Sequence, residues 1–176
     1  MVPDLASAND PSAVELGVKF RVDVAGSVAG VRFYKGSTNT GTHVGKLWRL
    51  DGTLLASATF AGETASGWQQ VTFPSPVPVA AGPTYVASYH TNAGHYAYSG
   101  GYFASAGVDS PPLHALRDGA AGGDGVYQYG GGGFPAQTYQ SANYWVDVVF
   151  QPASTAATAR LATIARLAAT ARSPRP

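Results

Sequence analysis

Apolar and polar residues alternate through the first half of the chain. In residues 16–24 every second position is apolar, and charged residues or glycine fill the positions between. A period of two is typical of a β-strand that has one face in a core and the other toward solvent. Similar short apolar runs, separated by turn residues, predict further strands at residues 31–34, 44–50, 54–60, 67–73, 84–91, 96–98, 126–129 and 144–150. The pattern therefore predicts an all-β fold, an antiparallel β-sandwich.

Three further signals refine this sandwich. Asp51 and Gly52 stand between two predicted strands and favour a type I′ hairpin. Prolines at positions 74, 76 and 78 indicate that no central strand continues beyond residue 73. Residues 144–150 are expected to close the domain by pairing with the opening strand, as the terminal strands of jelly-roll sandwiches commonly do. We therefore expect a jelly-roll-like arrangement.

Residues 94–142 are rich in glycine and tyrosine. Glycine runs such as residues 130–133 have high backbone entropy and no side chains to pack, so we expect long surface loops. Long loops on a rigid sandwich are where a binding site is expected. The composition of residues 1–13 is that of a linker, and residues 151–176 form an Ala/Thr/Arg-rich tail, disordered or a short helix. The domain is therefore placed at residues 14–150.

Composition narrows the classes of function. The chain has 176 residues, 12% of them charged, and its net charge of +1 gives no long-range field to recruit nucleic acid. It has no cysteine, so disulfides and thiolate metal sites are impossible. No apolar run reaches the length of a membrane span. The first residues lack the basic and apolar regions of a signal peptide, so none is predicted in this sequence.

Five segments carry a family resemblance: ELGVKF, GVRFYKGSTNTGTHVGKLW, LASATFAGETASGWQQVTF, AGPTYVASYHTNAGH and NYWVDVVF. In these segments the chain resembles the bacterial domain of unknown function 4082 (DUF4082). The resemblance implies a module of exported multi-domain bacterial proteins, with an extracellular or cell-wall location and with the flanking domains of the parent protein as partners. It implies no established activity.

Three histidines are candidate metal ligands. His43 and His95 fall in predicted loops and His90 ends a predicted strand, and three or four nitrogen or oxygen ligands can hold zinc or copper. Their spacing matches no compact ligand motif, so each could equally bond a loop backbone and pack on a tyrosine. A metal-dependent hydrolase using these three residues is one alternative function. No serine elbow or paired carboxylates are recognisable, so the domain is predicted not to be an enzyme.

Glu15 and Asp147 interrupt the two terminal strands. By analogy with carbohydrate-binding jelly rolls, the two carboxylates could join loop carbonyls around a structural calcium ion, which takes about 6 to 8 oxygens. The alternative is an ion pair between Asp147 and Lys19 or Arg21 on the neighbouring strand. No other cofactor is expected.

Aromatic residues of the loop region give the main functional prediction. An aromatic ring beside hydrogen-bonding side chains is how protein surfaces bind sugar faces, although the same tyrosines could instead fix the loops to the sandwich. We expect a non-catalytic extracellular module that binds carbohydrate, a polysaccharide or cell-wall glycan. An architectural spacer or protein-interaction domain is the alternative. The predicted ligand-binding residues are His90, His95, Tyr96, Tyr98, Tyr102, Tyr127 and Tyr129.

Overall fold

The computed structural model describes residues 1–153, and within this range the chain is all-β. Its strands are β1 (Val14–Val22), β2 (Gly26–Lys35), β3 (His43–Arg49), β4 (Leu54–Thr59), β5 (Gly67–Val79), β6 (Tyr85–Thr91), β7 (Val108–Ser110), β8 (Leu113–Ala115), β9 (Gly125–Tyr129), β10 (Gln137–Thr138) and β11 (Val146–Pro152). This part of the chain holds no helix long and apolar enough to cross a membrane. The predicted tail falls mainly on residues 154–176, outside the described residues.

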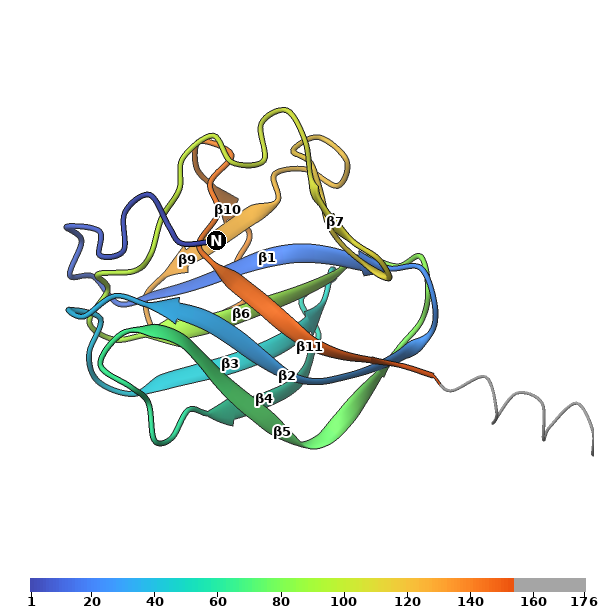
Figure 1. Cartoon of the computed structure of the whole chain (residues 1–176), viewed down its shortest axis with the longest axis horizontal. Coiled ribbons are helices and arrows are strands. Elements are labelled where there is room, and N and C mark those ends of the chain that lie inside the picture. Colours follow the sequence, from blue (N-terminus) through green and yellow to red (C-terminus); the bar gives the residue numbers. More distant parts are fainter. Residues whose placement is uncertain (154–176) are drawn as a thin grey trace, which may run out of the picture.

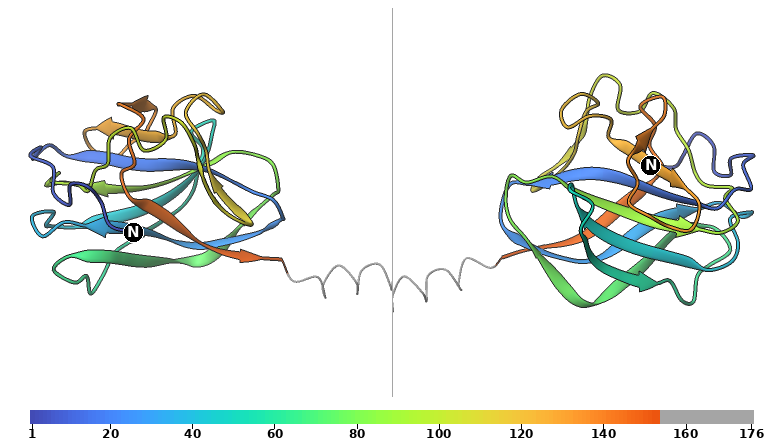
Figure 2. Two further views of the ribbon diagram at one scale, coloured as in Figure 1. Left: turned by 45° about the horizontal axis from the view of Figure 1, so that its top comes forward. Right: turned by 180° about the vertical axis from the view of Figure 1, so that it is seen from behind.

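The strands form two antiparallel sheets that pack face to face (Figures 1 and 2). The larger sheet has the order β10-β9-β1-β6-β3-β4, and the β7–β8 hairpin pairs with β1 next to β9. The smaller sheet has the order β11-β2-β5 and lies in front of the larger one in Figure 1. The predicted antiparallel sandwich is confirmed, while the jelly-roll pattern of connections stays a prediction.

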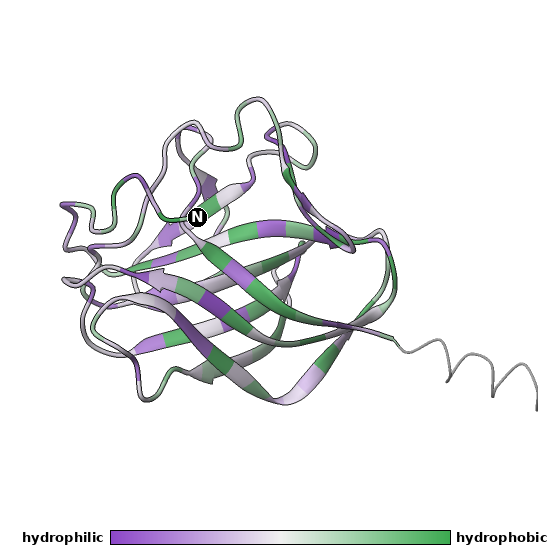
Figure 3. Cartoon of the chain, viewed as in Figure 1, coloured by the Kyte–Doolittle hydropathy of each residue, from purple (hydrophilic) through white to green (hydrophobic). Residues whose placement is uncertain are grey.

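Hydrophobic and hydrophilic residues alternate along many of the strands, as the colours of Figure 3 show. Val24, the last apolar residue of the predicted pattern, lies beyond β1 and is 46% exposed. The four others, Leu16, Val18, Phe20 and Val22, are 1–6% exposed. They join a core in which the Phe33 ring of β2 stacks on the Tyr89 ring of β6, with centroids 4.0 Å apart. Each such large apolar side chain stabilises the fold by about 1.5–3 kcal/mol. The core therefore holds the two sheets together.

The last strand does not pair with the first, so this prediction was wrong. β11 pairs with β2 along its whole length, from Val146 to Pro152. Since β6 occupies one edge of β1 and β8 and β9 share the other, β1 has no free edge for β11. β11 therefore belongs to the other layer, where its second edge pairs with no strand of residues 1–153.

Two local predictions also need correction. Asp51 and Gly52 do form the β3–β4 hairpin, but a type I′ turn needs positive φ at both central residues, and only Gly52, at 89°, has it. The strand predicted to end at residue 73 continues to Val79 through the three prolines. Proline is tolerated because β5 lies at the edge of its sheet, where a missing N–H leaves no central ladder broken.

Residues 1–13, interpreted above as a linker, lie against the sandwich. The backbones of Leu5 and Tyr98 exchange two hydrogen bonds of 3.0 and 2.8 Å, and the N–H of Ala8 donates to the carbonyl of Tyr96 at 2.9 Å. The strand predicted at residues 96–98 is reduced to this isolated bridge. The N-terminal segment thus covers part of the loop that follows β6.

Candidate functional site

A pocket of about 360 Å³ runs around the unpaired edge of β11. Its inner part lies between β11 and the β7–β8 hairpin, and its outer part reaches the solvent-facing side of the smaller sheet. Pockets of about 300–1,000 Å³ are usual for small-molecule sites. We call this site the aromatic pocket, and the lining residues that define it are Arg32, Trp68, Tyr102, Asn143, Trp145 and Asp147.

Three aromatic side chains form one wall of the aromatic pocket. Trp145 immediately precedes β11, and its ring centroid lies 5.9 Å from that of Tyr102 and 6.3 Å from that of Trp68. Trp68 lies on the outer face of β5, because the alternate residues Gln69 and Val71 are buried. Trp68 is 37% exposed and Trp145 only 5%. Trp68 therefore presents an accessible ring, which Trp145 supports from behind.

Trp145 is held in an unusual backbone conformation. Its φ is 56°, in the left-handed region that bulky residues rarely adopt. Its N–H donates to Oδ1 of Asn143 (2.7 Å), its carbonyl accepts from the N–H of Tyr34 (3.0 Å), and its indole N–H donates to Oγ of Ser99 (3.1 Å). Such strain costs on the order of 1–3 kcal/mol and persists only where the surroundings enforce it. These bonds fix the indole in the pocket wall.

Arg32 and Asp147 form the polar rim of the pocket. They are cross-strand partners on β2 and β11, with Nη1 of Arg32 at 3.5 Å from Oδ2 of Asp147. The guanidinium carbon of Arg32 also lies 4.8 Å from the ring centroid of Trp68, a cation–π contact. Their side chains are 35% and 45% exposed. The rim is therefore neutral overall and keeps accessible donors and acceptors beside an aromatic face.

His114 holds the hairpin that forms the opposite wall. Its Nδ1 lies 2.7 Å from Oδ1 of Asp109 in β7, and its Nε2 lies 2.7 Å from Oδ2 of Asp23, just after β1. The hydrogen bonds with Asp109 and then with Asp23 raise the pKa of His114 above its ordinary value. The protonated ring donates from both nitrogens and ties the hairpin to the turn after β1.

Four of the predicted tyrosines gather at one end of the sandwich. Tyr96, Tyr98 and Tyr127 surround the buried Tyr144, with ring centroids 5.8, 6.2 and 6.2 Å from its ring. Tyr129 packs on Tyr127 at 5.5 Å. The structure thus brings these four residues together, as a cluster of largely edge-to-face contacts.

Three hydroxyl groups of this tyrosine cluster have hydrogen-bond partners among the described residues. Tyr96 and Tyr129 donate to Oδ2 of Asp10, at 3.2 and 2.5 Å, and Tyr98 donates to Oε1 of Gln140 at 2.8 Å. Asp10 belongs to the N-terminal segment and Gln140 to the loop before β11. The cluster therefore ties both segments to the sandwich.

The remaining predicted ligand-binding residues lie elsewhere. Tyr102 lines the aromatic pocket. His90 lies on the outer face of the larger sheet, where its Nε2 is 2.9 Å from Oδ1 of Asn92. His95 has its Nδ1 2.9 Å from the carbonyl of Ala8. The seven predicted residues therefore occupy four different places and do not form a single platform.

The histidines proposed as metal ligands do not converge. His43 is fully buried on the core side of β3, whereas His90 faces outward from the neighbouring β6 and His95 binds the N-terminal segment. Within residues 1–153 no three His, Asp or Glu side chains are placed so that they could hold a metal ion. A hydrolase built on these three imidazoles has no assembled site there.

Glu15 and Asp147 do not fit a shared calcium site. Glu15 lies on the outer face of the larger sheet against Nζ of Lys46, at 2.6 Å. Asp147 lies on the outer face of the smaller sheet and pairs with Arg32, not with the lysine or arginine of β1 considered above. Because the sandwich separates the two carboxylates, they cannot coordinate one ion.

Sequence comparison places the chain in a family. The family model for the domain of unknown function DUF4082 matches residues 1–146. The chain belongs to the DUF4082 family. No curated protein sequence matches it. The DUF4082 match begins at residue 1, so it includes the N-terminal segment that bonds to residues 96 and 98.

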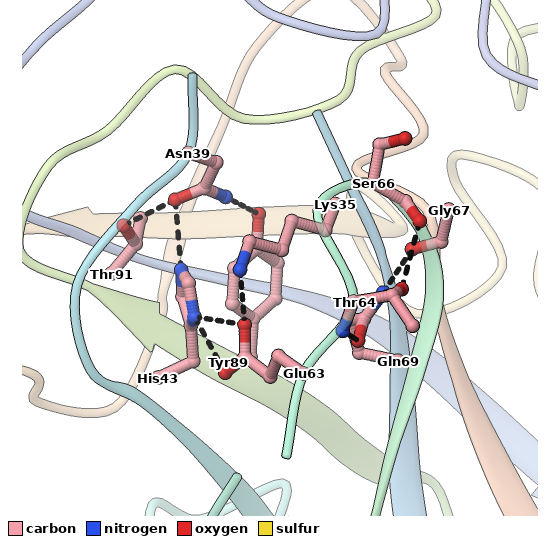
Figure 4. Close-up of polar contacts among 10 residues, drawn as sticks. All are labelled: Lys35, Asn39, His43, Glu63, Thr64, Ser66, Gly67, Gln69, Tyr89 and Thr91. Carbon is pink, nitrogen blue, oxygen red and sulfur yellow. Dashed lines mark hydrogen bonds and ion pairs between the residues drawn. The ribbon is translucent and has the colours of Figure 1, made fainter. Parts of the chain in front are cut away.

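Two of the DUF4082-like segments, 30–48 and 55–73, meet in a buried polar network (Figure 4). Nζ of Lys35 donates to Oε2 of Glu63 (2.7 Å), Nδ1 of His43 lies 2.8 Å from Oε1 of Glu63, and Nε2 of His43 lies 2.9 Å from Oδ1 of Asn39. Burial lowers the pKa of His43, although Glu63 opposes this. Since Lys35 balances Glu63, a neutral imidazole leaves the network without net charge. The network fixes the loops after β2 and β4.

Sequence reasoning missed most of the aromatic pocket. Trp68, Trp145 and Arg32 fall in predicted strands, and none of them is among the predicted ligand-binding residues. The alternation in residues 67–73 could have identified Trp68. Val71 and Phe73 occupy the odd-numbered positions that face the core, so Trp68 at an even-numbered position faces solvent. A tryptophan on the solvent face of a strand is a better candidate for binding than a tyrosine in a glycine-rich loop.

Proposed function

We propose that this DUF4082 domain is a non-catalytic accessory module that binds carbohydrate through the aromatic pocket. The observation that carries the proposal is the accessible ring of Trp68 beside the Arg32–Asp147 pair at the pocket mouth. A sugar has an apolar C–H face and an edge of hydroxyl groups, so it needs an aromatic surface and hydrogen-bonding groups side by side.

The polar rim matches the edge of a sugar. Arg32 offers only N–H donors and Asp147 offers only acceptors when ionised, so adjacent hydroxyls can pair with both. Their opposite charges compensate, which favours a ligand without net charge. The guanidinium over Trp68 also restricts the indole, so less side-chain freedom is lost when a ligand binds.

We further propose that the module serves a larger exported bacterial protein, outside the cell or at the cell wall. In that setting its partner is a polysaccharide or cell-wall glycan, and any catalysis belongs to flanking domains. The sequence resemblance supports this proposal, because it implies that DUF4082 domains occur in exported bacterial proteins. The small share of charged residues in the chain, 12%, also supports it.

Binding to a glycan array, followed by titration calorimetry with the retained glycan, tests the proposal. Trp68→Ala is expected to weaken binding about tenfold, which corresponds to about 1.4 kcal/mol. Tyr139→Ala is the matched control, because Tyr139 is 53% exposed and lies outside the aromatic pocket. This control is expected to bind as the unmodified domain does.

Two outcomes would contradict the proposal. If the folded domain retains no glycan, the spacer or protein-interaction alternative is favoured. If Tyr139→Ala weakens binding as much as Trp68→Ala does, the aromatic pocket is not the binding site.

A further inference from the structure

Glu15 places a buried carboxylate on the outer face of the larger sheet. It is 0% exposed although it points away from the core between the sheets. Its Oε2 accepts a hydrogen bond from Nζ of Lys46 (2.6 Å), and its Oε1 accepts one from Oγ of Ser88 (2.5 Å). Burial raises the pKa of Glu15, while Lys46 and Ser88 oppose the rise. Lys46 therefore balances the carboxylate within a small polar cluster.

His90 lies next to Glu15 with an unpartnered nitrogen. The side chain of His90 is only 9% exposed, and its Nε2 faces the acceptor oxygen of Asn92. Nε2 therefore carries the proton in the neutral ring, which leaves Nδ1 as an acceptor. Nδ1 has no hydrogen-bond partner within residues 1–153 and lies 3.7 Å from Oε2 of Glu15. A hydrogen-bond donor placed here would satisfy Nδ1, while Oε2 already accepts from Lys46.

Gly132 covers this cluster directly. Its carbonyl accepts a hydrogen bond from Nζ of Lys46 at 2.9 Å. A Cβ at Gly132 would lie 2.7 Å from that Nζ and 3.2 Å from Oε2 of Glu15, and its φ is 92°. The backbone conformation therefore favours glycine here, and any side chain would also displace the end of the Lys46 side chain.

The rest of the covering loop, residues 130–134, is held weakly. A Cβ at Gly131 or Gly133 would meet no atom within 4 Å. Phe134 packs edge-on against Trp48, with centroids 5.7 Å apart, and Trp48 in turn donates from Nε1 to Oγ of Ser88 at 2.7 Å. The N–H of Gly130 also donates to the carbonyl of Ala13 at 2.9 Å. Opening the loop therefore breaks two hydrogen bonds and the packing of Phe134 on Trp48, and it returns conformational entropy to four glycines.

We propose that residues 130–134 are a lid over a second ligand-binding site, the lidded site, formed by Glu15, Lys46, Trp48, Ser88 and His90. Its ligand is a small neutral polyhydroxylated compound, a single sugar residue. One hydroxyl donates to Nδ1 of His90, a neighbouring hydroxyl donates to Glu15, and the C–H face lies on Trp48. A neutral ligand is favoured because Lys46 already balances Glu15. The lidded site is separate from the aromatic pocket, which lies at the edge of the other sheet.

NMR spectroscopy of the whole domain tests this proposal, with D-glucose, D-galactose and N-acetylglucosamine as probes. At least one sugar is expected to shift the indole N–H signal of Trp48 and the ring signals of His90. The shifts are expected to persist in Trp68→Ala, because Trp68 belongs to the aromatic pocket. His90→Phe is expected to abolish the response at Trp48, since phenylalanine keeps the ring but lacks Nδ1.

Lid movement has its own readout. Gly131→Ala and Gly133→Ala introduce no contacts and restrict the open loop, so each is expected to weaken sugar binding about two- to fivefold while the fold is kept. The amides of residues 131–134 are expected to exchange with solvent faster than those of β1. Shifts confined to Trp68 and Trp145, no shift with any probe, or loop amides protected like those of β1 would each overturn the lidded site.

Discussion

Asp124, just before β9, is a buried carboxyl group whose ionisation is opposed by the fold. It is 1% exposed, its Oδ1 accepts a hydrogen bond from the N–H of Leu116 at 3.1 Å, and its Oδ2 has no hydrogen-bond partner in the part of the chain that the structure describes. Burial raises the pKa of Asp124 to about 8, and the Leu116 N–H and the charge of Lys19 oppose the rise only in part. The folded protein therefore holds a proton that the unfolded chain releases near the ordinary pKa of 3.8.

This difference sets the sign and size of a pH effect on stability. Between the two pKa values the folded state binds one more proton than the unfolded state, so the free energy of unfolding falls as pH rises. The slope is about 1.4 kcal/mol per pH unit, which gives a loss of about 3 kcal/mol from about pH 5 to about pH 7. Below the unfolded pKa the contribution of Asp124 is complete, and above about pH 8 it is lost.

Asp124→Asn removes the ionisable group and keeps the oxygen that faces Leu116. Urea unfolding at several pH values in this range is expected to show a smaller fall of stability with pH in Asp124→Asn than in the unmodified domain. Asp4→Asn, at an exposed position, serves as the control and is expected to leave the slope unchanged. Equal slopes for Asp124→Asn and the unmodified domain would refute the reasoning.

Three further predictions follow from single contacts. Asp109→Asn is expected to lower the pKa of His114 in an NMR titration, and an unchanged pKa would contradict the role given to Asp109. Because the pKa of His114 is raised in the folded state, the stability that its two carboxylate contacts contribute is lost as pH rises through that pKa. Glu63→Gln leaves the charge of Lys35 without a partner on a side chain that is 11% exposed, and it is expected to lower the free energy of unfolding in urea by about 3 kcal/mol. A change near zero would mean that water solvates the ion pair. Gly125→Ala would place a Cβ against the backbone carbonyl of Ala142 and is expected to cost about 2 kcal/mol, and a variant of unmodified stability would show that this contact relaxes.

The strands were predictable because alternation is a local property of the sequence. The buried residues of β1 and the β3–β4 hairpin follow from residues close together in the chain. The partner of β11 was not predictable in this way, because it depends on which edges of β1 other strands already occupy. The continuation of β5 through its prolines likewise depends on its edge position, which only the assembled sheet defines.

The candidate site was harder to predict for the same reason. Tyr102 and Trp145 are 43 positions apart in the chain and Trp68 comes from the other end of the smaller sheet, yet their rings form one wall. The loop tyrosines were recognisable as a group, but their hydroxyl partners on Asp10 and Gln140 come from distant segments. The sequence alone therefore identifies the aromatic residues. It does not show which of them hold loops against the sandwich and which of them line a pocket.

The two buried histidines show what separates a structural cluster from a candidate binding site. His43 and His90 each lie beside a glutamate that a lysine balances, on opposite faces of the larger sheet. Both ring nitrogens of His43 have partners, so that cluster is complete without a ligand. His90 has a partner for one nitrogen only, and the other faces a carboxylate oxygen beneath a loop of glycines. Each cluster contains one histidine, one glutamate and one lysine. The unsatisfied nitrogen of His90 is therefore what distinguishes its cluster as a site for a ligand.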